Sequence, residues 1–241
     1  MRFRLVIRII LLCAVALAIF ACGGSKSDDN TATATTVTAQ TVLGNAATRF
    51  GQVTSFHFKL SIDGSVPLDP AKTLALHGAE GDLSRPSSAQ AKADVSFLGA
   101  TISIKFVSIG GDQFITNPVT GVWENAPAGL GYNPAVLYDQ DKGIARVLSA
   151  LQDPKIAGSE SVNGQDSYHI TATVARVDVQ PIAAGAVSSQ APAIDLWITK
   201  SHSDLVKLTL RDSDASGKNT TTWTLEISQQ NKPVTIERPN V

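Results

Sequence analysis

Apolar and polar residues alternate through most of the chain from residue 55 onward. The first run carries a large apolar side chain at every second position, at Phe56, Phe58, Leu60 and Ile62. The same period of two recurs in five later segments, at residues 101–106, 167–174, 194–198, 206–210 and 223–227. Because successive side chains of a strand point to opposite faces, each run has one apolar and one polar face. The pattern predicts an antiparallel sheet that is covered on one side.

Short turn signals separate these runs. They are rich in Gly, Asn, Asp and Ser and lie at residues 110–112, 163–165, 200–204 and 212–217. Turns of this composition join neighbouring antiparallel strands as hairpins. The chain has neither an alternation of strands with helices nor a repeat of fixed period, which disfavours parallel sheets and propellers.

Two segments follow the helical period, with apolar residues at i, i+3, i+4 and i+7. The first predicts a short helix over residues 42–50, with its apolar face at Leu43, Ala46, Ala47 and Phe50. The second predicts a helix between Asp141 and Pro154, with its apolar face at Ile144, Val147, Leu148 and Leu151. The expected fold class is mainly β (α+β): one domain at residues 42–241, in which a curved antiparallel sheet carries a few helices on its apolar face.

The first 21 residues have the pattern of a bacterial signal peptide. Three arginines precede an apolar segment of twelve residues, 9–20, which is shorter than the ~18–20 residues of a membrane-spanning helix. The segment ends in Ile19-Phe20-Ala21-Cys22-Gly23, which resembles a lipobox, although Phe20 is bulkier than its usual occupant. We expect diacylglycerol on Cys22 and a protein anchored on the outer side of the cell membrane. In the alternative, residues 1–21 stay as an uncleaved anchor helix, and the compartment is the same.

Residues 22–41 predict a lipidated flexible tether. Between residues 23 and 41 the only large apolar side chain is Val37, so the segment cannot bury enough surface to order itself. A flexible chain of about 20 residues has a root-mean-square reach of ~25 Å. The domain that follows can therefore reorient above the bilayer.

Composition and charge narrow the classes of function. The 241 residues are 43% hydrophobic and 17% charged, as in globular proteins. The chain has 20 basic and 21 acidic residues, and without the three arginines of the first 21 residues its net charge is −4. We therefore expect no nucleic acid partner. Both cysteines, Cys13 and Cys22, precede the domain, which excludes disulfides and cysteine nucleophiles within it.

The residues give no signature of catalysis. No HExxH, GxSxG or local histidine–carboxylate motif occurs, and the four histidines, His57, His77, His169 and His202, are expected on polar strand faces or in turns. Gly110-Gly111 is too short for a phosphate loop and marks a hairpin. We expect a non-enzymatic protein with no metal and no cofactor.

The apolar face allows two interpretations. Alternation with two helices is what any closed sheet-and-helix domain needs, and by itself it favours a filled core. The chain, however, is only 6% aromatic and has one methionine, so few bulky side chains are available to cover a wide sheet. Curved antiparallel sheets of this kind can enclose space for a ligand.

Several short segments, in order and spacing, resemble the LppX/LprAFG family of actinobacterial lipoproteins over residues 40–239. They are residues 53–60 (VTSFHFKL), 109–114 (IGGDQF) with Trp123, 162–170 (VNGQDSYHI), 196–200 (LWITK) with 205–208 (LVKL), and 234–239 (VTIERP). Residues 183–190 are an insertion relative to that pattern.

The resemblance implies a half-barrel of antiparallel strands whose helices enclose a hydrophobic cavity. It implies a lipid or glycolipid ligand carried between the cell membrane and the outer envelope, with a membrane lipid exporter as a candidate partner, and we expect a monomer. The expected cavity lining is Phe56, Phe58, Leu60, Ile102, Ile104, Phe106, Leu137, Ile144, Val147, Leu148, Leu151, Ile170 and Leu196. In such a half-barrel the apolar face of the second helix roofs the concave side of the sheet, opposite Phe58, Leu60, Ile102 and Ile104. Three alternatives remain open: a structural or adhesive lipoprotein with a filled core, a carrier like LolA or LolB, and a hydrolase.

Overall fold

The computed structural model describes residues 37–241 apart from 69–72, 98, 128–133, 184, 215 and 218. The chain divides into two compact units, Met1–Thr36 and Val37–Val241, and the described residues belong to the second. The expected signal peptide, Cys22 and residues 22–36 of the expected tether lie outside the described residues. At residue 39 the chain is already helical, so the domain begins slightly before the expected residue 42.

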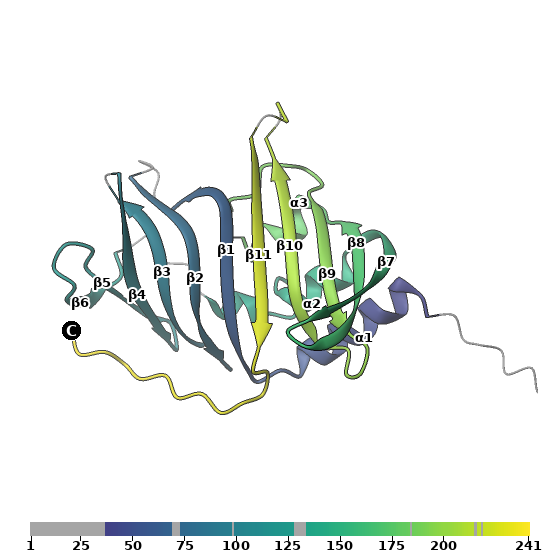
Figure 1. Ribbon diagram of the computed structural model, residues 1–241. Helices are drawn as coiled ribbons and strands as arrows, with labels where there is room; N and C mark the ends of the chain where they lie inside the picture. The colour runs from purple at the N-terminus through teal and green to yellow at the C-terminus, as the bar shows by residue number, and fades with distance from the viewer. Residues whose placement is uncertain are drawn as a thin grey trace, which may run out of the picture. The chain divides into compact units, whose positions relative to one another are not determined.

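Eleven strands form one antiparallel sheet (Figure 1). They are β1 (Ser55–Pro67), β2 (Leu74–Ser84), β3 (Ser88–Phe97), β4 (Ala100–Ile109), β5 (Asp112–Thr116), β6 (Trp123–Asn125), β7 (Gln152–Val162), β8 (Gln165–Thr173), β9 (Ala193–Thr199), β10 (Leu205–Ser213) and β11 (Thr220–Ser228). Their order across the sheet is β6-β5-β4-β3-β2-β1-β11-β10-β9-β8-β7. The predicted antiparallel sheet is thus confirmed.

The sheet consists of two meanders that meet at one seam. Strands β1 to β6 follow each other in space as in sequence, and so do β7 to β11. The seam is the pairing of β1 with β11, where Phe58 lies opposite Ile227 and Leu60 opposite Leu225. All four predicted hairpin turns join consecutive strands, namely β4–β5, β7–β8, β9–β10 and β10–β11. Each meander is therefore built from local pairings.

The six predicted strands are confirmed, but five further strands lack their pattern. In β2 and β3 the side chains that share the face of Phe58 are small, at Ala79, Gly81, Ala91 and Ala93. Strand β7 is exposed at most positions, and β5 and β6 are short. Without large apolar residues at every second position, such strands give no strong signal of period two.

Four short helical segments accompany the sheet: α1 (Ala39–Gly51), the 3-10 helix η1 (Pro134–Tyr138), α2 (Ile144–Ser149) and α3 (Arg176–Val179). The Thr38 side chain caps α1 by accepting a hydrogen bond of 3.2 Å from the backbone N–H of Thr41. Helix α2 ends earlier than expected, because Ala150 caps it and β7 begins at Gln152. Leu151 therefore lies in the connection rather than on the helix.

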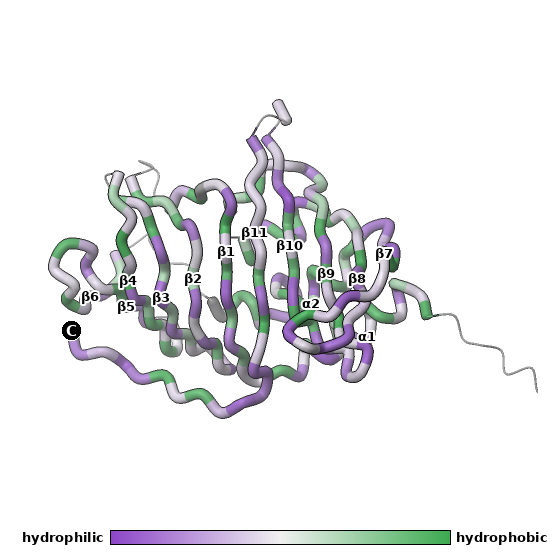
Figure 2. The backbone as a smooth tube through the Cα atoms, viewed as in Figure 1, coloured by the Kyte–Doolittle hydropathy of each residue, from purple (hydrophilic) through white to green (hydrophobic). Residues whose placement is uncertain are grey.

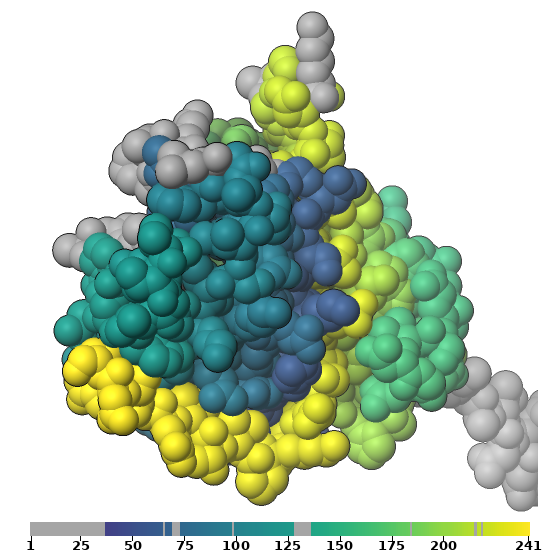
Figure 3. Space-filling model, turned by 60° about the vertical axis from the view of Figure 1, so that its left-hand side comes forward, coloured from purple at the N-terminus to yellow at the C-terminus, as the bar shows by residue number. Residues whose placement is uncertain are grey.

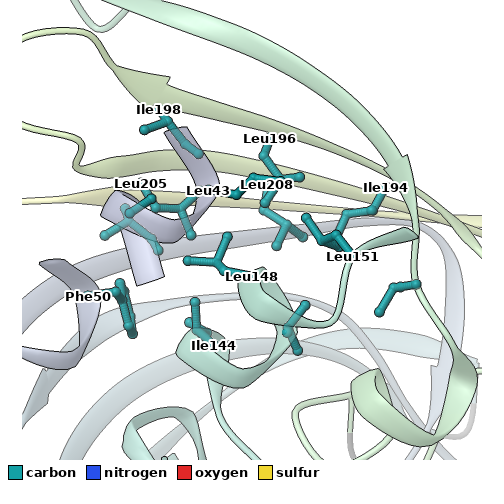
Figure 4. Close-up of a cluster of buried hydrophobic side chains, with 14 of the residues drawn as sticks. Leu43, Phe50, Ile144, Leu148, Leu151, Ile194, Leu196, Ile198, Leu205 and Leu208 are labelled. Atoms are coloured by element: carbon teal, nitrogen blue, oxygen red, sulfur yellow. The ribbon is translucent and has the colours of Figure 1, made fainter. Parts of the chain in front are cut away.

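We call the face of the sheet against which the helices pack the inner face, and its opposite the outer face. In Figure 1 helices α2 and α3 lie behind strands β9 and β10. Hydrophobic and hydrophilic segments alternate along the strands (Figure 2), as expected for a sheet with one covered face. The main core joins Leu43 and Phe50 of α1 and Leu148 of α2 to Ile194 and Leu196 of β9 (Figure 4).

The C-terminal segment after β11 runs as extended chain beneath the strands of the first meander (yellow in Figures 1 and 3). The backbone N–H of Asn231 donates to the carbonyl of Ser55 over 2.8 Å at the start of β1. Farther along, a guanidinium nitrogen of Arg238 lies 3.0 Å from the Asp112 carboxylate, and the guanidinium covers the ring of Phe114. The chain end is thereby attached to both β1 and β5.

Candidate inner-face site

The thirteen side chains expected to line a cavity fall into different environments. Seven of them, none more than 8% exposed, belong to the main core: Phe56, Ile144, Val147, Leu148, Leu151, Ile170 and Leu196. They pack against one another and against α1 (Figure 4). Beneath α1 and α2 the described residues thus form a filled core.

The expected partners of α2 need a correction. We expected its apolar face to lie opposite Phe58, Leu60, Ile102 and Ile104. Ile104 is buried in a second, smaller cluster with Leu74 and Val95, and Ile102 packs against that cluster. The α2 side chains share the main cluster with α1 and β9, and of the four residues Phe58 packs against that cluster. The reason is the sheet order, which places β4 at a distance of six strands from β9.

The other expected side chains are half-buried. Phe58, Leu60, Ile102, Phe106 and Leu137 all keep some exposed surface. Four of them come from the inner face of β1 and β4, and Leu137 comes from η1. The four strand residues and their half-buried neighbours form the surface that we call the inner apolar patch: Phe58, Leu60, Ala79, Ala91, Ala93, Ile102, Phe106 and Leu225.

Small residues lie in the middle of the inner apolar patch. Ala79, Ala91 and Ala93 separate the larger side chains of β1 from those of β4. At Gly81 no side chain fits, because a Cβ there would lie 2.7 Å from the Cα of Ala91 and closer still to the Gln90 carbonyl oxygen. The close approach of β3 to β2 thus requires glycine.

Of the described helices, mainly η1 lies against the half of the sheet that carries the inner apolar patch. Helix α1 contacts α2, β7 and β9, and α2 contacts α3 and η1. Among the described helices, η1 is the one that mainly contacts β3. The inner apolar patch therefore keeps surface that the side chains of the described residues do not cover, and this surface is available to an apolar ligand.

Three buried polar atoms on the inner side have no hydrogen-bond partner among the described residues: Ser108 Oγ, Tyr138 OH and Trp223 Nε1. Ser108 pairs with Ala89 near the Phe56 end of the sheet, and the Tyr138 ring packs against Phe56 with centroids 5.5 Å apart. Trp223 lies opposite Ile62, near the other end of β1. Unsatisfied buried polar groups cost ~1–3 kcal/mol each.

Tyr138 is held as a neutral phenol. Burial raises the pKa of its hydroxyl well above the ordinary value of 10, because the ionised form would lose hydration. The Arg85 guanidinium, 4.3 Å from the ring centroid, opposes this shift but does not cancel it. The hydroxyl can therefore donate a hydrogen bond at any physiological pH.

Two histidine–carboxylate groups lie on the outer face, although no local motif in the sequence predicts them. His57 Nδ1 lies 2.8 Å from an oxygen of Asp82, and its Nε2 lies 3.3 Å from Glu80. His169 lies between Asp195 and Glu160 in the same way, at 2.8 and 3.1 Å. Each group joins neighbouring strands, so only the strand register could have revealed it. No group suited to hold a metal ion occurs in the described part of the chain.

Within the described ranges, no helix combines the length and the apolar character that a bilayer span needs.

Solved structures share this fold. LprF from Mycobacterium bovis matches 83% of this chain and 96% of its own with a TM-score of 0.68 and 21% identity. LppX from Mycobacterium tuberculosis matches 83% and 98% with a TM-score of 0.61 and 20% identity. A LolA superfamily protein from Nitrosomonas europaea reaches a TM-score of only 0.29.

Related sequences indicate the same family. Lipoprotein LprA of Mycobacterium tuberculosis is 30% identical over 237 residues, which are 94% of this chain and 93% of LprA. The lipoarabinomannan carrier protein LprG of Mycolicibacterium hassiacum is 30% identical over 95% of this chain and 94% of its own. The model of the LppX_LprAFG lipoprotein family matches residues 38–236. The chain therefore belongs to the LppX/LprAFG family of lipoproteins.

Proposed function

We propose that this chain is an extracytoplasmic lipoprotein, anchored in the cell membrane through Cys22, that binds a lipid or glycolipid and carries it across the cell envelope. The observation that carries the proposal is the inner apolar patch, which offers half-buried apolar side chains beside a strip of small ones. Relatives that are named lipoarabinomannan carrier proteins support it.

Acyl chains fit the chemistry of the patch. Each Å² of apolar surface that a ligand removes from water contributes about 25 cal/mol, and the half-buried side chains of β1 and β4 still have such surface to lose. The unpartnered atoms of Ser108, Tyr138 and Trp223 are buried, so carbonyl or hydroxyl groups of the same molecule can pair with them once neighbouring side chains move apart. The ligand is therefore amphipathic.

Filling the patch tests this function. Ala91→Leu and Ala93→Leu each add a side chain to the strip between Phe58 and Phe106. We expect the doubly substituted protein, purified as the full chain from its native membrane, to yield several-fold less lipid on organic extraction and mass spectrometry. Ala157→Leu on the exposed edge strand β7 is the matched control and should retain the lipid. A wild-type protein without extractable lipid contradicts the proposal.

A second candidate function rests on a different observation. The core under α1 and α2 is filled, as in a structural or adhesive surface lipoprotein. For such a protein the extraction would yield no lipid from any variant, and the leucine substitutions would change only the melting temperature.

A further inference from the structure

A row of charged side chains crosses the outer face of the sheet. Six residues on six adjacent strands are direct cross-strand neighbours, from β10 through β11, β1, β2 and β3 to β4: Lys207, Glu226, Lys59, Glu80, Lys92 and Lys105. Opposite charges in such positions stabilise a sheet, whereas like charges destabilise it. The first five residues alternate in sign, so each of Glu226 and Glu80 lies between two lysines.

The alternation fails at the end of the row. Lys92 and Lys105 face each other across β3 and β4, and Lys105 has no glutamate in the row beside it. Within the described residues neither lysine forms an ion pair within 4.0 Å. By contrast, Lys59 lies between Glu226 and Glu80. The surplus positive charge of the row is thus concentrated at Lys92 and Lys105.

This pair of lysines borders a cleft of about 290 Å³ on the outer face. Its lining combines the two lysines with Trp123, Gln90 and Val107, and it also includes the acidic residues Glu80 and Asp82. Figure 3 shows this part of the molecule, with β1 to β5 in blue to teal. The side chains of Lys92 and Lys105 lie on the face opposite the inner apolar patch, since Lys92 and Ala91 are consecutive residues of one strand. Gly81, Ala91 and Phe106 also border the cleft.

The carboxylates near the lysines are engaged elsewhere. Asp82 accepts a hydrogen bond of 2.9 Å from Gln90 and is also bound by His57, which contacts Glu80 as well. Asp94, two positions along β3 from Lys92, accepts a hydrogen bond of 2.6 Å from Ser103. These contacts leave the ammonium groups of Lys92 and Lys105 as the charges that a ligand can neutralise.

We propose that this cleft binds an organic anion, with a phosphate or carboxylate group between Lys92 and Lys105 and the carbon skeleton against Trp123. Ionised donors and acceptors form stronger hydrogen bonds than neutral ones, and an anion also removes the repulsion between the two lysines. A soluble phosphorylated compound and the headgroup of an anionic phospholipid share this chemistry. The inference goes beyond the proposed lipid carriage, because it concerns the other face of the sheet.

Amine labelling of the lysines tests the site residue by residue. The lipidated full chain is anchored in phosphatidylcholine vesicles, and labelling rates are measured by mass spectrometry with added glycerol 3-phosphate or with phosphatidylglycerol in the vesicles. We expect labelling of Lys92 and Lys105 to slow, while that of Lys59 stays constant. Protection by glycerol 3-phosphate identifies a soluble anion, and protection by phosphatidylglycerol alone identifies a headgroup. If neither anion slows the labelling of Lys92 and Lys105, or if an anion protects all three lysines equally, the proposal would be overturned.

Substitutions give an independent measurement. For the anion that protects, calorimetry on Lys92→Gln and Lys105→Gln should give affinities lower by about tenfold, as expected for loss of a charge-assisted contact. Lys59→Gln removes the same charge from the same row and should change the affinity less than about twofold. Equal losses in all three variants would mean that only overall charge matters, and would contradict a built site. All three side chains are exposed, so the fold is expected to persist, and circular dichroism checks this.

Discussion

Gly81 is a single position at which the shape of the sheet depends on a missing side chain. In Gly81→Ala the new Cβ would collide with the backbone of β3 at Gln90 and Ala91, which cannot move as a flexible side chain could. We expect a loss of ~1–3 kcal/mol in the free energy of unfolding, as for other overpacked sites. Thermal denaturation measures it. Gly158→Ala in β7 is the control, since nothing lies within 4 Å of its Cβ position, and an equal loss there would refute the steric explanation.

Asp214 makes the β10–β11 turn sensitive to acid. Hydrogen bonds from the side chains of Ser216 and Asn219 lower its pKa from 3.8 to about 2. Because the folded-state pKa lies below the ordinary value, its stabilising contribution is present above pH 3.8 and disappears as the pH falls through about 2. We expect the carboxyl resonance of Asp214 to titrate near pH 2 in NMR spectra of the folded protein. A midpoint near 3.8 would mean that these hydrogen bonds do not persist in solution.

Helix α2 is short, so its place in the fold depends on packing rather than on helix propensity. Val147 is fully buried in the main core between α1 and β9. We expect Val147→Trp to lower the free energy of unfolding by ~1–3 kcal/mol, because a filled core has no room for an indole. Calorimetric unfolding measures the change.

The same variant distinguishes a filled core from a cavity at this helix. If the space under α2 were open, the melting temperature would stay near that of the wild type and any bound lipid would be displaced. Ser149→Trp on the exposed side of α2 is the control and should leave both unchanged.

At the scale of the whole molecule, the sequence allowed the sheet and its hairpins to be predicted wherever large apolar residues alternate with polar ones. It did not reveal β2 and β3, because the inner-face positions in the middle of both strands carry alanine and glycine, while large residues such as Leu83 and Val95 lie near the strand ends. The assignment of α2 to the wrong strands has a similar origin. Periodicity indicates which side chains share a face, but their packing partners depend on the order of the strands in the sheet. The β1–β11 pairing, which sets this order, is specified by no local pattern.

The proposed attachment to the membrane is also a property of the whole molecule, and in the proposal it depends on Cys22, which lies outside the described part. In Cys22→Ala the thiol that accepts diacylglycerol is missing, so we expect neither acylation nor cleavage before residue 22. Mass spectrometry of the purified protein measures both. A variant that still matures to an N-terminus at residue 22 and carries acyl chains would show that the anchor lies elsewhere.

The β1–β11 seam has a consequence for the order of folding. Within each meander the paired segments are close in sequence, whereas residues 57–63 of β1 pair with residues 222–228 of β11 across most of the chain. Closing so long a loop costs entropy that no local contact offsets in advance. We therefore expect the two meanders to form early and to dock late, so that Leu225→Ala slows refolding less than it speeds unfolding. Until they dock, Phe58 and Leu60 border an unpaired strand edge, at which a second copy of the chain can add.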